Sequence, residues 1–188
     1  CAAISDVLEQ LGFEQFQIKL NHRQLLRQLI QSAGIDTSLE ESALVAIDKL
    51  DKIGEEGVLK ELAERGIDGE GGTRRMAWLK SASGEDNSGI LEFLGSVLDP
   101  PEAQSALEDL KSLLEMSGGT SAGRHLTLDP ALARGLGYYT GCIFEIAVED
   151  LAGSLGGGGR YDGLIGMFGK QEIPAVGFSL GLERILLV

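Results

Sequence analysis

The chain has few cysteines, few histidines and few basic residues, and each shortage excludes a class of protein. Its 188 residues include two cysteines, Cys1 and Cys142, and two histidines, His22 and His125. These residues lack the spacing of a zinc site, and two cysteines make no disulfide framework, so we expect no bound metal and a cytosolic redox setting. The 16 Lys and Arg face 29 Asp and Glu, a net charge of -13. Such acidity argues against general electrostatic affinity for nucleic acid.

Long apolar runs and common catalytic motifs are also missing. No apolar run approaches the roughly 20 residues of a membrane-spanning helix, so we expect a soluble protein with no membrane partner. Neither a P-loop nor a dinucleotide-binding G-x-G-x-x-G motif is present. Nor do the residues form a plausible nucleophile set, because His125 is expected at the surface and Cys142 in an apolar strand row. The chain lacks an initial Met and a secretory signal and ends on an apolar run, so both ends are expected to be cuts through a longer protein.

Charge and glycine are distributed unevenly along the chain. Residues 1–120 carry a net charge of -11 and 13 glycines, whereas residues 121–188 carry -2 and 14 glycines. The apolar period also changes, from about 3.6 to about 2, near residue 124. These changes predict solvated helices first and a glycine-rich sheet afterwards.

The pattern predicts the following elements. Helices are expected at 4–11, from an Asn21 cap to Gly34, from 38 to Gly54, at 58–62, from Pro100 to Gly118 and from Gly181 onward. Strands are expected at 16–20, 126–128, 138–148 and 174–179. Residues 66–87 are expected to form a loop.

Two arginines stand out because they lie beside small residues in a segment poor in charge. A guanidinium in such a place can hold a carboxylate or a phosphate in bidentate geometry. Arg134 and Arg184 are therefore candidate anion-binding residues. The alternative is an ordinary ion pair with a nearby carboxylate such as Glu183 or Glu145.

All three tyrosines of the chain lie beside glycine-rich turns. Tyr138 is expected to pack in the core, whereas for Tyr139 and Tyr161 a pocket and the core remain equal alternatives. The run from Gly156 to Gly159 is either a flexible linker or a strand pressed against a small molecule, where a Cβ would occupy the ligand's volume.

Three ordered motifs carry a resemblance to a known family. Residues 132–145 (LARGLGYYTGCIFE) and 157–163 (GGGRYDG) resemble the two histidine-specific signatures of histidyl-tRNA synthetases. Residues 175–184 (AVGFSLGLER) resemble motif 3 of class II aminoacyl-tRNA synthetases. Segments 18–26 and 46–54 are also similar to segments of bacterial members.

The resemblance implies an α+β fold, in which the class II antiparallel sheet with flanking helices carries a mostly helical insertion. Residues 1–36 are expected in the catalytic core, 37–120 in the insertion that reaches toward the tRNA acceptor arm, and 121–188 in the core with the signatures and motif 3. One departure is Gly137, which stands where the family commonly has Asp or Asn.

The resemblance also implies the site residues. Arg134 matches the catalytic arginine that acts on the histidine carboxylate and the α-phosphate; Arg184 and Gly181 match ATP-binding positions; Tyr139 and Tyr161 line the histidine pocket; and Gly157, Gly158 and Gly159 form its close wall. No metal ligand is expected among the protein's own side chains.

The function implied for the parent protein is that of a cytoplasmic, homodimeric histidine–tRNA ligase. It would use ATP and Mg²⁺ to convert L-histidine to histidyl-adenylate and transfer the histidine to tRNA(His). The fragment alone is expected to be inactive, because motif 1 and the motif 2 arginine lie outside it. The alternative is a catalytically inactive synthetase-like paralogue, such as the regulatory subunit of ATP phosphoribosyltransferase.

Overall fold

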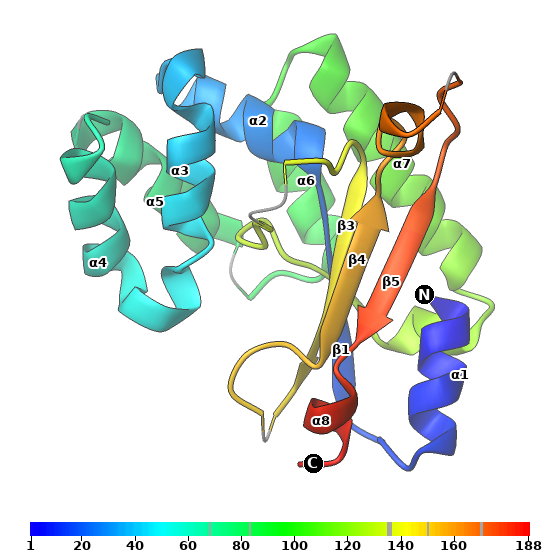
Figure 1. Cartoon of the computed structure of the whole chain (residues 1–188). Coiled ribbons are helices and arrows are strands. Elements are labelled where there is room, and N and C mark those ends of the chain that lie inside the picture. Colours follow the sequence, from blue (N-terminus) through cyan, green and yellow to red (C-terminus); the bar gives the residue numbers. More distant parts are fainter. Residues whose placement is uncertain (68, 83, 135–136, 150, 170) are drawn as a thin grey trace. The chain divides into compact units, whose positions relative to one another are not determined.

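The structure is a computed structural model of the 188-residue chain, and it describes every residue except 68, 83, 135–136, 150 and 170 and the side chains of 51, 74–76 and 79–81. The chain forms two compact units. The first unit comprises Cys1–His22, Glu108–Asp129 and Tyr138–Val188, and the second comprises Arg23–Leu107 and Pro130–Gly137. Figure 1 shows the helices and strands of the chain, coloured from the N-terminus to the C-terminus.

The first unit is built on a five-stranded sheet in the order β2-β1-β3-β4-β5. Its strands are β1 (Phe16–His22), β2 (Leu126–Leu128), β3 (Cys142–Val148), β4 (Gly156–Arg160) and β5 (Val176–Leu180). The β1–β3, β3–β4 and β4–β5 pairs are antiparallel, and these four strands lie side by side in Figure 1. β1 and β2 are parallel, which the long crossover between them permits. The predicted α+β class is confirmed, with a mixed sheet.

Alternating apolar residues anchor the sheet in the core. β1 buries Phe16, Ile18 and Leu20 at every second position. The register places Ile18 opposite Ile146 and Leu20 opposite Phe144, both buried on β3. Cross-strand apolar pairs of this kind are the unit of sheet stabilisation.

Short helices complete the first unit. They are α1 (Ala2–Gln10), the 3₁₀ turns η2 (Ser121–Arg124) and η3 (Ile165–Met167), and α8 (Leu182–Ile185). Helix α1 is followed by Gly12 at φ 92°, a left-handed conformation that glycine adopts without steric penalty.

The second unit is helical. It contains α2 (Arg23–Ser32), the 3₁₀ turn η1 (Thr37–Leu39), α3 (Glu40–Ile47), α4 (Leu50–Glu64), α5 (Gly69–Ala82) and α6 (Asn87–Val97), and α7 (Pro101–Ser117) begins in it and ends in the first unit. Gly34, just after α2, has φ 87°, as a helix-terminating glycine requires. Within α4, Gly54 has non-helical backbone angles (φ 68°) at a kink between two helical segments, so the helix break predicted at this residue is confirmed. The single helix predicted from 38 to Gly54 was wrong, because α3 ends at Ile47 and α4 begins at Leu50.

The loop predicted at 66–87 was also wrong, because α5 occupies most of it. Glycines in its first turn lower helix propensity and conceal the element in the sequence. In the fold, a Cβ on Gly72 would lie 3.2 Å from Leu59 Cδ2 and 3.3 Å from Leu62 Cδ1, so α4 and α5 approach closely there. Helix α6 was missed, although Asp86 caps it by accepting a 2.8 Å hydrogen bond from Gly89 N–H.

Two further local predictions differ from the structure, and one open alternative is decided. The strand predicted from 138 begins at Cys142, because the chain turns before Gly141, where the Arg160 side chain packs against the backbone. Asn21 belongs to β1, and its Oδ1 accepts a 2.8 Å hydrogen bond from His22 N–H. The Gly156–Gly159 run forms most of β4, which lies between β3 and β5, so the strand alternative is confirmed and the linker alternative is wrong.

The two compact units do not follow the predicted domain bounds residue by residue. Residues 23–36, assigned above to the catalytic core, lie in the second unit, and residues 108–120, assigned to the insertion, lie in the first. The functional division at 37 and 120 therefore remains a prediction.

Candidate active site

The structure brings all three tyrosines together in the first unit. Tyr138 and Tyr139 precede β3, and Tyr161 follows β4. The centroid of the Tyr138 ring lies 4.7 Å from that of Tyr139 and 5.9 Å from that of Tyr161. The centroids of Tyr139 and Tyr161 are 6.4 Å apart. The Tyr138–Tyr161 pair is perpendicular at 88°, an edge-to-face arrangement that aromatic quadrupoles favour. Two sequence segments thus form one aromatic cluster.

The tyrosines differ in exposure. Tyr139 is 6% exposed, whereas Tyr138 is 39% exposed. The prediction that Tyr138 packs in the core was therefore wrong, because the chain turns before β3 and Tyr138 is not on the strand's apolar row. Tyr161 is half-buried.

Two facing glycines make room for two of these rings. Gly159 on β4 is the register partner of Gly177 on β5. A Cβ on Gly159 would lie 2.6 Å from Tyr139 Cδ1, and one on Gly177 would overlap the Tyr161 hydroxyl. Neither Cβ would fit at these positions. The Tyr139 and Tyr161 rings can therefore lie over the strands only because Gly159 and Gly177 lack side chains.

Gly177 was missed as a site residue in the sequence analysis. The available signal was a glycine inside a predicted strand, which commonly marks a close backbone approach. The ring that approaches comes from another segment, however, so only the fold identifies it.

The predicted close wall, Gly157 to Gly159, is buried within β4. A Cβ on Gly158 would overlap the carbonyl oxygen of Gly177, and one on Gly156 that of Ser179. The backbone of β5 thus accounts for the glycines at 156 and 158, and the Tyr139 ring for the one at 159. Their role as the wall of a ligand pocket remains a prediction.

Arg184 is fixed by backbone oxygens. Its Nη1 donates to Ser154 O at 2.9 Å and to Ala152 O at 3.2 Å. A Cβ on Gly181, the residue before α8, would lie 3.2 Å from Arg184 Cδ, and the N–H of Gly181 donates to Leu155 O at 2.9 Å. Gly181 and Arg184 therefore form one local arrangement, and the guanidinium is exposed.

Arg134 is half-buried and lies in the Pro130–Gly137 segment of the second unit. Within that unit, Gly137 faces the α3 residue Glu41, whose Oε1 would lie 3.6 Å from a Cβ at position 137. Of the predicted site residues, the structure places the tyrosines and the β4 glycines together in the first unit. Arg134 belongs to the second unit.

A buried polar group lies where β1 and β3 meet. His22 and Cys142 are register partners, and His22 Nε2 is 3.5 Å from Asp109 Oδ2. Burial lowers the pKa of His22 and raises the pKa of Cys142 to about 12. Cys142 therefore stays a protonated thiol at neutral pH, which makes it a poor nucleophile.

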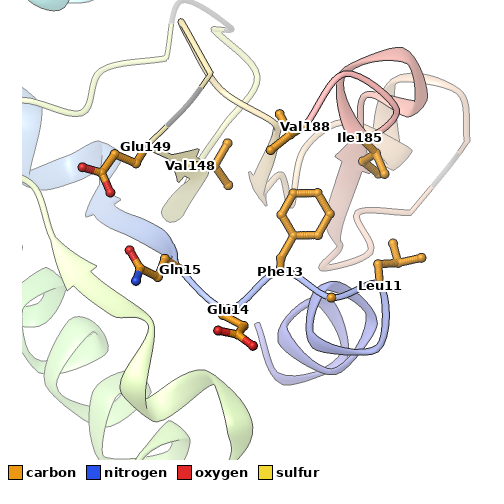
Figure 2. A pocket seen from close by; sticks show the side chains of 9 residues that line it. Leu11, Phe13, Glu14, Gln15, Val148, Glu149, Ile185 and Val188 are labelled. Carbon is orange, nitrogen blue, oxygen red and sulfur yellow. The ribbon is translucent and has the colours of Figure 1, made fainter.

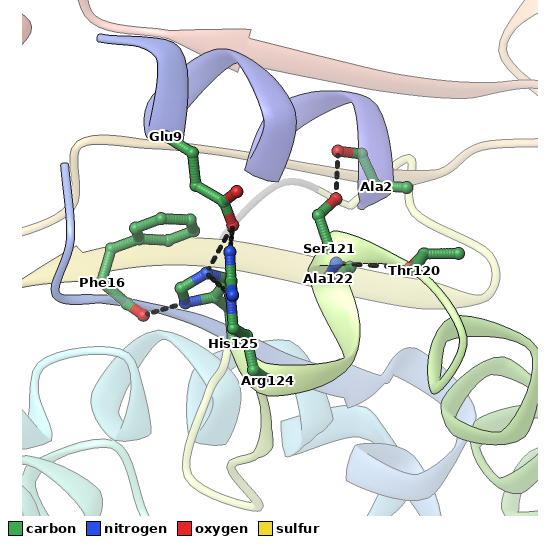
Figure 3. A network of polar contacts seen from close by, with 8 residues as sticks. All are labelled: Ala2, Glu9, Phe16, Thr120, Ser121, Ala122, Arg124 and His125. Atoms are coloured by element: carbon green, nitrogen blue, oxygen red, sulfur yellow. Dashed lines mark hydrogen bonds and ion pairs between the residues drawn. The ribbon is translucent and has the colours of Figure 1, made fainter. Parts of the chain in front are cut away.

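His125 is buried at 7% exposure, so its predicted surface position was wrong. Its ring stacks on Phe16 with centroids 3.8 Å apart. Its Nδ1 lies 3.1 Å from Phe16 O and its Nε2 lies 3.0 Å from Glu9 Oε1. Figure 3 marks both contacts with dashed lines. Hydrogen bonds from Arg124 and His125 also hold the pKa of Glu9 below its ordinary value. The ring is buried because both nitrogens have polar partners.

A separate cavity of about 450 Å³ opens between the α1–β1 turn, the end of β3 and the C-terminal residues. Figure 2 shows its mixed lining, apolar at Phe13, Val148 and Ile185 and acidic at Glu14 and Glu149. The tyrosine cluster is not part of its lining.

The described part of the chain holds neither a metal-binding cluster of side chains nor a helix that could span a membrane. Among the side chains that the structure describes, no group of three or more His, Cys, Asp or Glu is arranged to hold a metal ion. Over the same residues, no helix has the length and apolar character needed to cross a membrane.

Comparisons with known proteins identify the family. The family model described as histidyl-tRNA synthetase matches residues 2–185. The histidine–tRNA ligase of Leifsonia xyli subsp. xyli is 41% identical over 190 residues, covering 98% of this chain and 43% of that protein. The chain thus spans less than half the length of this curated relative.

Solved structures share the fold. The histidyl-tRNA synthetase of Nostoc sp. PCC 7120 matches with a TM-score of 0.84 and 29% identity, over 99% of this chain and 44% of that one. A Bacillus halodurans protein, titled an ATP phosphoribosyltransferase regulatory subunit/histidyl-tRNA synthetase, matches at 0.80 over 98% of this chain and 48% of that one. Its 19% identity shows the fold alone. With the family model covering almost all residues, the chain belongs to the histidyl-tRNA synthetase family.

Proposed function

We propose that the protein containing this chain is a histidine–tRNA ligase. It activates L-histidine with ATP, accompanied by Mg²⁺, and transfers the histidine to tRNA(His). Membership of the family supports this proposal. We also propose that it acts as a cytoplasmic homodimer, and the two free cysteines of the chain suit a reducing compartment.

The observation that carries the proposal is the tyrosine cluster. Tyr139 belongs to the first histidine-specific signature and Tyr161 to the second, and their rings meet over Gly159 and Gly177. A half-buried phenol beside a buried one offers an apolar wall and a hydroxyl, which suits an imidazole that must be both packed and hydrogen-bonded. Gly157, Gly158 and Gly159 supply the flat wall beside it.

The arginines supply the charge that the reaction requires. In activation, a carboxylate oxygen of histidine attacks the α-phosphorus of ATP, the new C–O–P linkage forms, and the bond to pyrophosphate breaks. Arg134 holds the carboxylate and the α-phosphate, and Arg184 with Gly181 holds the γ-phosphate. Catalysis then consists of orienting two anions and stabilising the phosphoryl charge that develops. No nucleophilic side chain is needed, in accord with the high pKa of Cys142.

The test is ATP–pyrophosphate exchange by the full-length protein with each amino acid in turn. We expect exchange that depends on histidine and on Mg²⁺, followed by charging of tRNA(His). Histidine binding without exchange would instead support the regulatory paralogue. Absence of both would contradict the proposal.

A further inference from the structure

We propose that Thr140 is a positioning residue that holds Tyr161 in the aromatic cluster. Thr140 directly follows Tyr139, and it contacts the chain on both sides of Tyr161. The inference rests on the proposed function, because its effect is read through histidine recognition by Tyr161.

The backbone N–H and the side-chain hydroxyl of Thr140 both contact this segment, and the hydroxyl also donates to Arg160 O at 3.5 Å. Its N–H donates to Arg160 O at 2.9 Å. Its Oγ1 accepts a hydrogen bond from Asp162 N–H at 3.1 Å. The peptide groups before and after Tyr161 are therefore both bonded to Thr140, which limits rotation of the backbone that carries the ring.

Two other contacts hold the same three residues. Arg160 Nε donates to both carboxylate oxygens of Asp162, at 3.0 and 2.9 Å, across Tyr161. Tyr161 N–H donates to Ala175 O at 2.8 Å. The Arg160–Asp162 contact lies within the segment itself, whereas the hydrogen bond to Ala175 joins the segment to the residue before β5. Thr140 alone among these partners comes from the segment that carries Tyr138 and Tyr139, so it sets the distance between the two groups of rings.

The hydroxyl can be removed without changing the shape of the side chain. Valine is nearly isosteric with threonine, but it cannot accept the Asp162 N–H. Serine keeps the hydroxyl and loses only the methyl group. Thr127, on β2 of the same unit, is a control for the loss of a threonine hydroxyl outside the tyrosine cluster; it is half-buried, whereas Thr140 is exposed.

The experiment measures histidine KM and kcat by ATP–pyrophosphate exchange in the full-length protein. Loss of one hydrogen bond that orders a binding residue corresponds to roughly a two- to tenfold change in an equilibrium constant. We therefore expect Thr140→Val to raise the histidine KM by about that factor with kcat within about twofold. Thr140→Ser and Thr127→Val should stay within about twofold of the wild type in both parameters.

A double-mutant cycle shows whether Thr140 acts through Tyr161. We expect Thr140→Val to change the KM much less in a Tyr161→Phe background than in the wild type, because the ring it positions has already lost its polar contact. Equal effects in both backgrounds would overturn the positioning role, as would a Thr140→Val enzyme with unchanged KM. A folded Thr140→Ser variant as impaired as Thr140→Val would do the same. A wild-type protein without exchange would instead contradict the proposed function.

Discussion

At the scale of single residues, the absence of a side chain matters as much as its presence. Tyr139 and Tyr161 can approach the sheet because Gly159 and Gly177 face each other beneath them. The tyrosines were identifiable from their motifs in the sequence. Gly177 and Thr140 were not, because their roles depend on contacts between segments that the sequence separates by about 20 residues.

A methyl group at Gly177 should displace the Tyr161 ring. Its Cβ would lie 2.9 Å from Tyr161 Cε1 and would overlap the hydroxyl. A misplacement of about 1 Å in a site can lower enzyme activity by up to about a hundredfold. We therefore expect the displaced Tyr161 ring in Gly177→Ala to raise the histidine KM by about tenfold or more. Gly163→Ala is the matched control, since nothing lies within 4 Å of a Cβ there. Equal KM values for the two variants would show that the close contact is unimportant.

His22 should make stability depend on pH. Burial lowers its pKa below the ordinary 6.5, against the smaller opposing effect of Asp109, while Arg160 lowers the pKa further. The unfolded state therefore binds the proton more readily, so the free energy of unfolding should fall as the pH drops below about 6.5 toward the folded pKa.

Urea denaturation of the full-length protein between pH 7.5 and 5.5 measures this effect. We expect the wild type to lose stability over that range and His22→Gln to lose less, because glutamine carries no proton in either state. An identical pH slope for both proteins would refute the assignment to His22.

At the scale of elements, helices and strands with a regular apolar period were predictable. β1 has period 2 and ends near the expected residue, and α7 begins at Pro101 as its proline pair indicates. α5 was not predictable because its glycines oppose a helix, and the contact of Gly72 with α4 is a tertiary effect. β4, made almost wholly of glycine, has no apolar pattern, and its two neighbouring strands define it.

Two glycines of the second unit, Gly95 inside α6 and Gly34 after α2, should respond oppositely to alanine because their φ angles differ. Gly95, inside α6, has room for a Cβ, whose nearest neighbour is Leu107 Cδ1 at 4.0 Å. We expect Gly95→Ala to stabilise the unit by about 0.5–1 kcal/mol through helix propensity. Gly34→Ala should lower the free energy of unfolding by about 1 kcal/mol or more, because a φ of 87° is unfavourable for alanine.

Chemical denaturation of the full-length variants, monitored by helical circular dichroism, tests this pair. A loss of stability in Gly95→Ala would mean that α6 packs more tightly than the 4.0 Å contact indicates.

At the scale of the whole molecule, the sequence predicted the fold class and the family, and the family model confirms the latter. The site residues were predicted through motifs, which name positions but not distances. The structure adds the geometry of the tyrosine cluster and of the Arg184 loop. His125 shows the limit of a local reading, because Phe16 and Glu9, distant in sequence, supply the partners that bury it.

Calorimetric titration of the full-length protein with histidine measures whether the tyrosine cluster binds this amino acid. We predict saturable histidine binding that Tyr161→Phe weakens roughly tenfold, because the hydroxyl that hydrogen-bonds the imidazole is removed. Tyr138→Phe, at an exposed position, should stay within about twofold of the wild type. Equal histidine affinity of the wild type and Tyr161→Phe would contradict histidine binding through the Tyr161 hydroxyl.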